Sequence, residues 1–204
     1  MAEHPTCIEP GFLRRFPWSE LAPHAIRLLA AGEPVRIEEI AAAAGVTSAE
    51  VDAMLSGQPG TDWDEQGRLI GFGLTQRPTA HRLILAGRQF YTWCAMDTLF
   101  FPVILGERAI AESRCPATER AIRVELEPER VVSVEPDHAV VSRIGPGLVS
   151  DIRAEVCDHG HFFASAEAAR DWAAQHPHGR VGPVREAFDQ ARRSWLAEAA
   201  GVRS

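Results

Sequence analysis

Cys94 and Asp97 are the first residues of this chain whose types and spacing suggest chemistry. They lie three positions apart in an almost wholly apolar stretch, residues 90–106. On a helix, positions i and i+3 share a face, so the thiol and the carboxyl are expected to meet. We expect Thr92 to cap this helix, which would place Cys94 in the first turn, where unpaired N–H groups favour a thiolate. Pro102 should end or kink the helix. The stretch predicts a buried soft nucleophile beside a proton-carrying group.

Cys157 is the candidate partner of this pair, because it ends an apolar strand-like run just before a loop and a capped helix. If the run continues as a strand, Cys157, His159 and His161 point to one face. With Cys94 they would form a two-sulfur, two-nitrogen set suited to Zn²⁺ or copper, although Gly160 weakens the strand interpretation. A second possibility is a cysteine nucleophile activated by one of these histidines, as in acyl transfer. No local signature of such a hydrolase is present.

A third chemistry uses both thiolates on one soft electrophile, with Asp97 as the acid. Thiolates bind soft metals strongly, and mercury in an alkylmercury compound is such a centre. Two thiolates on the metal raise electron density on the bound carbon, which a carboxylic acid can then protonate. Burial among Trp93, Phe100 and Phe101 would raise the pKa of Asp97 and keep a proton available near neutral pH.

Composition bounds the class of protein. The chain has 204 residues, 46% of them hydrophobic and 24% charged, which is ordinary for a globular protein with a sizeable core. No apolar run approaches the roughly 20 residues that span a bilayer, and no secretion signal is evident, so we predict a cytoplasmic protein without a membrane partner. The net charge of −7 argues against a nucleic-acid partner. The four cysteines, which form no Cys-x-x-Cys pair, are Cys7, Cys94, Cys115 and Cys157.

The N-terminal third reads as a helical module. Residues 35–55 form a helix, a tight turn at Gly45 and a second helix, with Thr47 and Glu50 matching a capping box. The second helix is acidic and lacks Lys and Arg, which favours a packing role over DNA recognition. Residues 61–74 resemble a hairpin, and residues 75–79 a linker. We therefore predict a winged-helix-like module over residues 1–78.

Residues 79–204 are expected to form an αβ core carrying both active-site cysteines. A hairpin leads into Cys94, and residues 109–144 alternate in strand fashion, which predicts a small, mostly antiparallel sheet. Ser165 should cap a helix, and a last helix should run over about residues 184–199. The predicted fold class is α+β, with the N-terminal winged-helix-like module packed on the C-terminal αβ core.

Three segments carry a resemblance to a known family. Residues 91–102 (YTWCAMDTLFFP) resemble the catalytic segment of the bacterial organomercurial lyases, also called alkylmercury lyases. Residues 67–82 (GRLIGFGLTQRPTAHR) are similar to the segment before it. Residues 156–165 (VCDHGHFFAS), with Asp171-Trp172-Ala173 following, resemble the second cysteine segment. The likeness extends over about residues 35–200.

The resemblance implies cleavage of carbon–mercury bonds by protonolysis, giving a hydrocarbon and Hg²⁺. The family's two essential cysteines correspond to Cys94 and Cys157, and its catalytic aspartate to Asp97, which also has a place among the mercury ligands. No organic cofactor is implied. The implied partners are an organomercurial substrate and cellular thiols. Either these thiols or a mercuric reductase would accept the Hg²⁺. Composition further suggests that Phe100 and Phe162 shape a pocket for the organic group.

The chain departs from the family pattern at Asp158, where many members have a second cysteine directly after the catalytic one. We expect activity to survive, with an effect on Hg²⁺ release or on the pKa of Cys157. Cys115 matches a family cysteine and is expected to be structural, whereas Cys7 lies outside the resemblance. The alternative from another class is a non-catalytic thiol–imidazole protein that binds or senses metals and keeps the winged-helix module.

Overall fold

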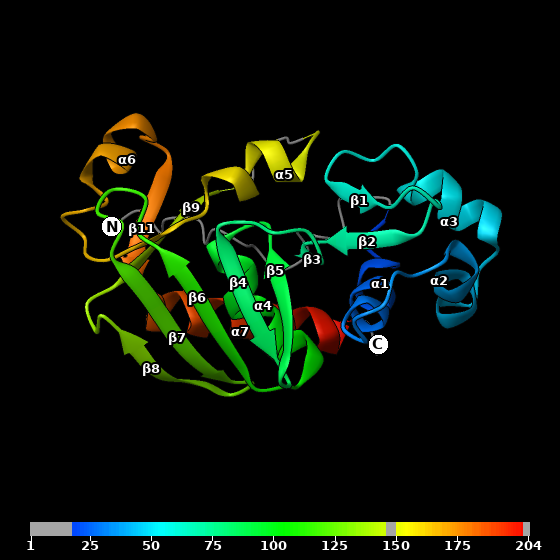
Figure 1. Cartoon of the computed structure of the whole chain (residues 1–204), viewed down its shortest axis with the longest axis horizontal. Coiled ribbons are helices and arrows are strands. Elements are labelled where there is room, and N and C mark those ends of the chain that lie inside the picture. Colours follow the sequence, from blue (N-terminus) through cyan, green and yellow to red (C-terminus); the bar gives the residue numbers. More distant parts are fainter. Residues whose placement is uncertain (1–17, 146–149, 202–204) are drawn as a thin grey trace.

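The computed structural model describes residues 18–145 and 150–201. A large antiparallel sheet has two helices packed behind it, and a helical module lies at one end of the molecule (Figure 1). The helices behind the sheet are α4 (Ala95–Leu105) and α7 (Val184–Gly201). This arrangement confirms the predicted α+β class. Within the described residues, no helix combines the length and the apolar character needed to cross a bilayer.

The N-terminal module contains the predicted helix-turn-helix. Its helices are α1 (Ala22–Leu29), α2 (Ile37–Ala44) and α3 (Ser48–Leu55). Gly45 ends α2 in the left-handed conformation, at φ 71°, where glycine meets no steric penalty. The predicted capping box at the start of α3 is also confirmed, because Thr47 Oγ1 accepts from Glu50 N–H while Thr47 N–H donates to Glu50 Oε2.

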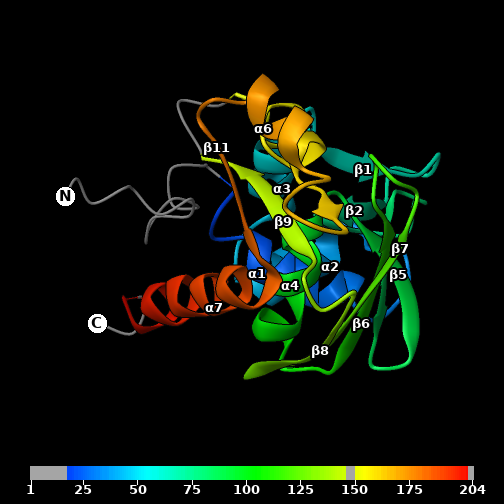
Figure 2. The ribbon, with the colours of Figure 1, turned by 90° about the vertical axis from the view of Figure 1, so that its left-hand side faces the viewer.

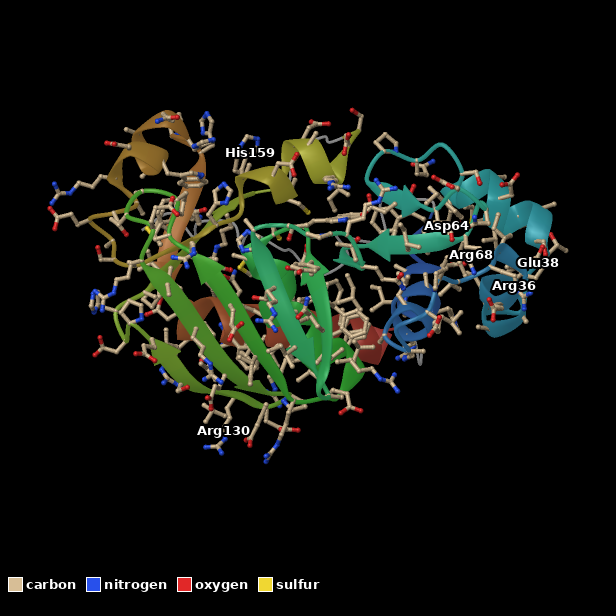
Figure 3. The ribbon with its side chains drawn as sticks, viewed as in Figure 1. Arg36, Glu38, Asp64, Arg68, Arg130 and His159 are labelled. Atoms are coloured by element: carbon tan, nitrogen blue, oxygen red, sulfur yellow. The ribbon has the colours of Figure 1, made fainter. Side chains whose placement is uncertain are left out.

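The large sheet has eight strands in the order β1-β2-β3-β5-β4-β6-β7-β8, and every pairing is antiparallel. Their bounds are β1 (Thr61–Trp63), β2 (Leu69–Phe72), β3 (Leu74–Thr75), β4 (His81–Leu85), β5 (Arg88–Thr92), β6 (Ala109–Arg114), β7 (Ala121–Glu127) and β8 (Arg130–Glu135). The predicted hairpin before Cys94 is β4–β5. The hairpin of the module is β1–β2, and its turn is closed by Arg68 Nε, which donates to Asp64 Oδ2 at 2.7 Å (Figure 3).

This sheet is larger than the small sheet that the sequence predicted. The reason is β3, which lies at the start of the predicted linker and pairs with β2 on one side and β5 on the other. Leu74 and Thr75 are both buried there, so this segment is a paired strand inside the protein and not an exposed linker. The hairpin of the module is thereby continuous with the strands that lead to Cys94. The division of the chain at residue 78 stays a prediction.

A second sheet of three strands carries the segment around Cys157. Its order is β10 (Phe162–Phe163), β9 (Val140–Ile144), β11 (Gly179–Pro183). The helix α6 (Arg170–Gln175) lies next to this sheet (Figure 2), and α5 (Ile152–Glu155) is near β9 in Figure 1. The strand predicted over residues 151–157 is wrong. Asp151 Oδ1 accepts from the N–H groups of Arg153 and Ala154, which caps α5 instead.

Two further helix predictions need correction. Ser165 caps only a turn, accepting from Ala168 N–H at 3.2 Å, and α6 begins at Arg170. The α4 helix does not end before Pro102 but continues to Leu105, with Gly106 as a left-handed C-cap. Proline removes only one hydrogen bond of the helix, and the apolar residues around it are buried on the core, which outweighs that loss. The predicted last helix is confirmed as α7.

Candidate active site

Cys94 is the N-cap residue of α4, with extended backbone angles of φ −141° and ψ 169°. Its Sγ accepts from Asp97 N–H at 3.4 Å, and its own N–H donates to Asp97 Oδ2 at 3.2 Å. The predicted cap, Thr92, is wrong, because its hydroxyl instead donates to the Cys94 carbonyl at 2.8 Å. Cys94 therefore sits just before the first turn, but its sulfur still receives a helix N–H. The thiol and the carboxyl hold each other in place.

Cys157 reaches Cys94 through a tight turn. It begins the 3-10 turn Cys157–His159, and Gly160 follows. The Gly160 carbonyl accepts from Ala95 N–H, the first N–H of α4, at 2.9 Å. A Cβ atom at Gly160 would lie 2.9 Å from the Cβ of Cys94. The two cysteine segments therefore approach so closely that only glycine fits between them.

Cys94, Asp97 and Cys157 are brought together as predicted. One ligand atom from each lies within 4.8 Å of the others. Both thiols are buried, and the carboxyl is partly buried. Across the described residues this is the single such group of three acidic, thiol or imidazole ligands. His159 and His161 do not join it, because residues 157–159 form a turn and not the strand that would align their side chains.

The two thiols have unequal proton affinities. The hydrogen bond that Cys94 donates to Cys157, together with burial and the nearby carboxyl, raises the pKa of Cys94 well above its ordinary value. For Cys157 the same hydrogen bond lowers the pKa, but desolvation and the carboxylates of Asp97 and Asp158 outweigh it and leave the pKa raised. Cys157 therefore ionises first, and Cys94 keeps its proton longer.

Asp97 has a pKa suited to moving a proton. Desolvation raises its pKa to about 6, although the hydrogen bonds from the Cys94 side chain and N–H act in the opposite direction. A group with a pKa near the working pH can both accept a proton and return it. Burial thus has the effect on Asp97 that the sequence predicted.

A cavity of about 830 Å³ opens onto this site. Cys157 and Asp97 are at its wall, and the remaining lining is mainly apolar. The large apolar side chains that line it are Trp18, Leu21, Ile26, Met54, Phe72, Trp93, Phe100, Phe101, Ile104, Ile152 and Trp195. Phe100 lines the cavity as predicted, and its contact with an organic group stays a prediction. Phe162 does not line this cavity, because it is buried within β10 of the second sheet.

A buried carboxylate that sequence reasoning missed ties the two cysteine segments to the module. Asp62 accepts from Thr75 Oγ1 at 2.9 Å, Trp93 Nε1 at 3.3 Å and Arg153 Nη1 at 2.9 Å. Trp93 directly precedes Cys94, and Arg153 belongs to α5, which leads into the second cysteine. The one signal in the sequence was Asp62 on the inward face of a short strand, where a buried charge requires partners.

His81 contacts the Gly160 carbonyl, at the end of the turn that begins with Cys157. It is buried, its Nδ1 lies 2.8 Å from Ser113 Oγ, and its ring donates to the Gly160 carbonyl. Desolvation, with the nearby His161 ring, lowers the pKa of His81 from 6.5 to about 3. The ring is therefore neutral in the folded protein at any moderate pH.

This neutral ring predicts a loss of stability in acid. Below pH 6.5 the unfolded chain binds a proton at His81 that the folded chain cannot bind until about pH 3. The free energy of unfolding should then fall by about 1.4 kcal/mol per pH unit, or about 2 kcal/mol between pH 6.5 and pH 5. In urea unfolding, His81→Gln, which does not titrate, should lose about 2 kcal/mol less over this range. An identical pH dependence in both proteins would contradict this assignment.

Fold and site together define a class: an α+β protein with two buried thiols grouped with a protonatable carboxyl, in which the carboxyl and one thiol line an apolar cavity. Such a site is suited to holding a soft metal that carries an organic group. Comparison with models of known protein families gives two matches. A family model described as alkylmercury lyase matches residues 74–196, and one described as the helix-turn-helix domain of alkylmercury lyase matches residues 18–73.

Individual proteins named alkylmercury lyase are also similar to this chain. An alkylmercury lyase of Staphylococcus epidermidis is 46% identical over 167 residues, which cover 82% of this chain and 77% of that protein. An alkylmercury lyase of Pseudomonas putida is 45% identical over 163 residues, covering 80% and 77%. The crystal structure of the mercury-bound form of MerB2 shares the fold, with a TM-score of 0.72 at 22% identity over 89% of this chain and 98% of that one. The chain belongs to the alkylmercury lyase family.

Proposed function

We propose that this chain cleaves the carbon–mercury bond of organomercurials by protonolysis, releasing a hydrocarbon and leaving Hg²⁺ on two thiolates. The observation that carries the proposal is the grouping of Cys94, Asp97 and Cys157 within 4.8 Å, with Asp97 and Cys157 at the wall of an apolar cavity. The relatives named alkylmercury lyase support the reaction type. The cavity supplies an apolar surface for the organic group.

Capture begins at Cys157. It is the thiol that ionises first, and it faces the cavity through which the substrate enters. Its thiolate displaces the thiolate that the organomercurial carries in a thiol-rich medium, and the displaced group leaves as a free thiol with the proton of Cys157. The organic group remains on mercury, which is now bound to the protein by one sulfur.

Cleavage follows from Cys94. As its sulfur binds mercury, which makes the thiol far more acidic, Cys94 gives its proton to the Asp97 carboxylate, with which it shares the reciprocal contacts at the start of α4. Asp97, now a carboxylic acid, gives the proton to the carbon. The electron pair of the carbon–mercury bond stays with carbon and forms the new C–H bond, while mercury remains as Hg²⁺ between the two sulfurs. Asp97 returns to its carboxylate form, near enough to act as a further mercury ligand.

Two external thiols complete the cycle by taking Hg²⁺ as their dithiolate and returning both protons to the cysteines. A mercuric reductase is the proposed final acceptor. The chemistry calls on no organic cofactor. Because both cysteines must stay reduced, we propose the cytoplasm, where thiols are kept reduced, as the compartment.

The test is release of benzene from phenylmercury in excess thiol. The unaltered chain should release benzene, and Cys157→Ser should release almost none, because a serine hydroxyl is a poor ligand for mercury. Cys115→Ser is the matched control, since Cys115 is also buried but lies outside the site, and it should keep its turnover. Tight mercury binding without benzene release by the unaltered chain would indicate a sequestering or sensing protein instead.

A further inference from the structure

Two histidines outside the thiol site lie close enough to share one ligand. His159 is in the turn that begins with Cys157, at the upper edge of the molecule between α5 and α6 (Figure 3). His176 is the C-cap residue of α6. The distance from His159 Nδ1 to His176 Nε2 is 3.2 Å. Both residues are only partly buried.

The ring of His176 is oriented for metal binding. Its Nδ1 lies 2.8 Å from the Trp172 carbonyl oxygen, which can only accept, so Nδ1 carries the hydrogen. In the neutral ring, Nε2 then presents a lone pair toward His159. A backbone carbonyl on the far nitrogen is the usual support of a histidine that ligates a metal. The indole of Trp172 stacks on the ring at 4.4 Å and fixes its plane.

The spacing of the two nitrogens fits one small cation. A tetrahedral ion that holds two nitrogens at 2.0–2.1 Å places them about 3.3–3.4 Å apart. The observed 3.2 Å separation needs only a small adjustment. Imidazole suits Zn²⁺, Cu²⁺ and Ni²⁺, and the exposed carboxylate of Asp158 on the same turn adds negative charge.

We propose that His159 and His176 form a second metal site, which takes a borderline divalent cation such as Zn²⁺ and is separate from the thiol pair. To ligate the ion, His159 carries its ring hydrogen on Nε2, so that Nδ1 offers a lone pair beside that of His176 Nε2; water fills the other positions of the ion. Because His159 and Cys157 belong to the same turn, the bound ion links that turn to α6. It therefore steadies Cys157 opposite Cys94 without taking part in the reaction.

The test is calorimetric titration of Zn²⁺ into the full chain carrying Cys94→Ser and Cys157→Ser, which removes the two thiols of the active site as competing ligands. One Zn²⁺ per chain is expected to bind. His159→Ala and His176→Ala, each added to this background, should weaken the affinity at least about tenfold. His178→Ala is the control, because His178 is an exposed histidine two residues away, and it should leave the affinity unchanged.

Thermal unfolding gives a second measurement on the unaltered chain loaded beforehand with Hg²⁺, which occupies the thiols. Zn²⁺ should raise the melting temperature, since a ligand of the folded state stabilises it. The rise should vanish in His176→Ala and persist in His178→Ala. No Zn²⁺ binding, or equal binding by all the histidine variants, would overturn the proposal.

Discussion

Asp97→Asn should still bind mercury through the two thiolates and yet lose most of its turnover. The amide is nearly the same size as the carboxyl and can still accept the Cys94 N–H, so the start of α4 keeps its geometry. Both thiolates remain to hold mercury. The amide, however, cannot take a proton from a thiol or pass one to carbon. General acid catalysis typically contributes about 10²–10⁴-fold, and we expect a loss of that size.

Benzene release and Hg²⁺ stoichiometry, measured on the same samples, separate the two effects. Asp158→Asn is the matched control, because it makes the same chemical change on an exposed carboxylate next to Cys157. It should retain turnover and shift only the ionisation of that thiol, whose pKa the Asp158 charge raises. Full turnover by Asp97→Asn would show that carbon receives its proton from another group.

The sequence predicted that Cys94 and Asp97 would meet because this contact is local, whereas the approach of Cys157 was implied by the family resemblance. A thiol and a carboxyl three residues apart at the start of an apolar helix must meet whichever residue caps that helix. Cap preferences favoured Thr92 as the N-cap residue of α4. The start of the helix is instead held by Gly160, whose carbonyl accepts from the first N–H of α4. This contact joins residues far apart in sequence, and no local pattern contains it.

Two of the features that sequence reasoning missed also depend on contacts between residues far apart in the sequence. Asp62 and Arg153 are 91 residues apart, and neither has an unusual neighbourhood in the sequence. The short strand β3 has two residues and exists only because strands on both sides pair with it. Periodicity also suggested a strand before Cys157, and a single capping side chain, Asp151, turned it into a helix. Long-range pairing thus accounts for Asp62 and β3, whereas the Asp151 cap is a local signal that competes with the strand periodicity.

Gly160 is the position where the fold and the chemistry depend on a single missing methyl group. Its φ of −92° suits any residue, so an alanine there causes no backbone strain. The obstacle is steric, since the new Cβ would lie 2.9 Å from Cys94 Cβ and 3.5 Å from its Sγ. Either cysteine segment must then move by several tenths of an ångström. The Gly160 carbonyl, which binds both Ala95 N–H and the His81 ring, would move with it.

We therefore expect Gly160→Ala to lower the free energy of unfolding by about 1–3 kcal/mol, as overpacking does. Turnover should fall about tenfold, because the two sulfurs must hold one mercury atom, and a misplacement of 1 Å can cost about a hundredfold. Gly182→Ala in β11 is the matched control: its Cβ meets nothing within 4 Å, so both quantities should stay nearly unchanged. Benzene release and urea unfolding measure the two effects. If Gly160→Ala kept full turnover, the close approach of the two cysteine segments would not be a requirement of the reaction.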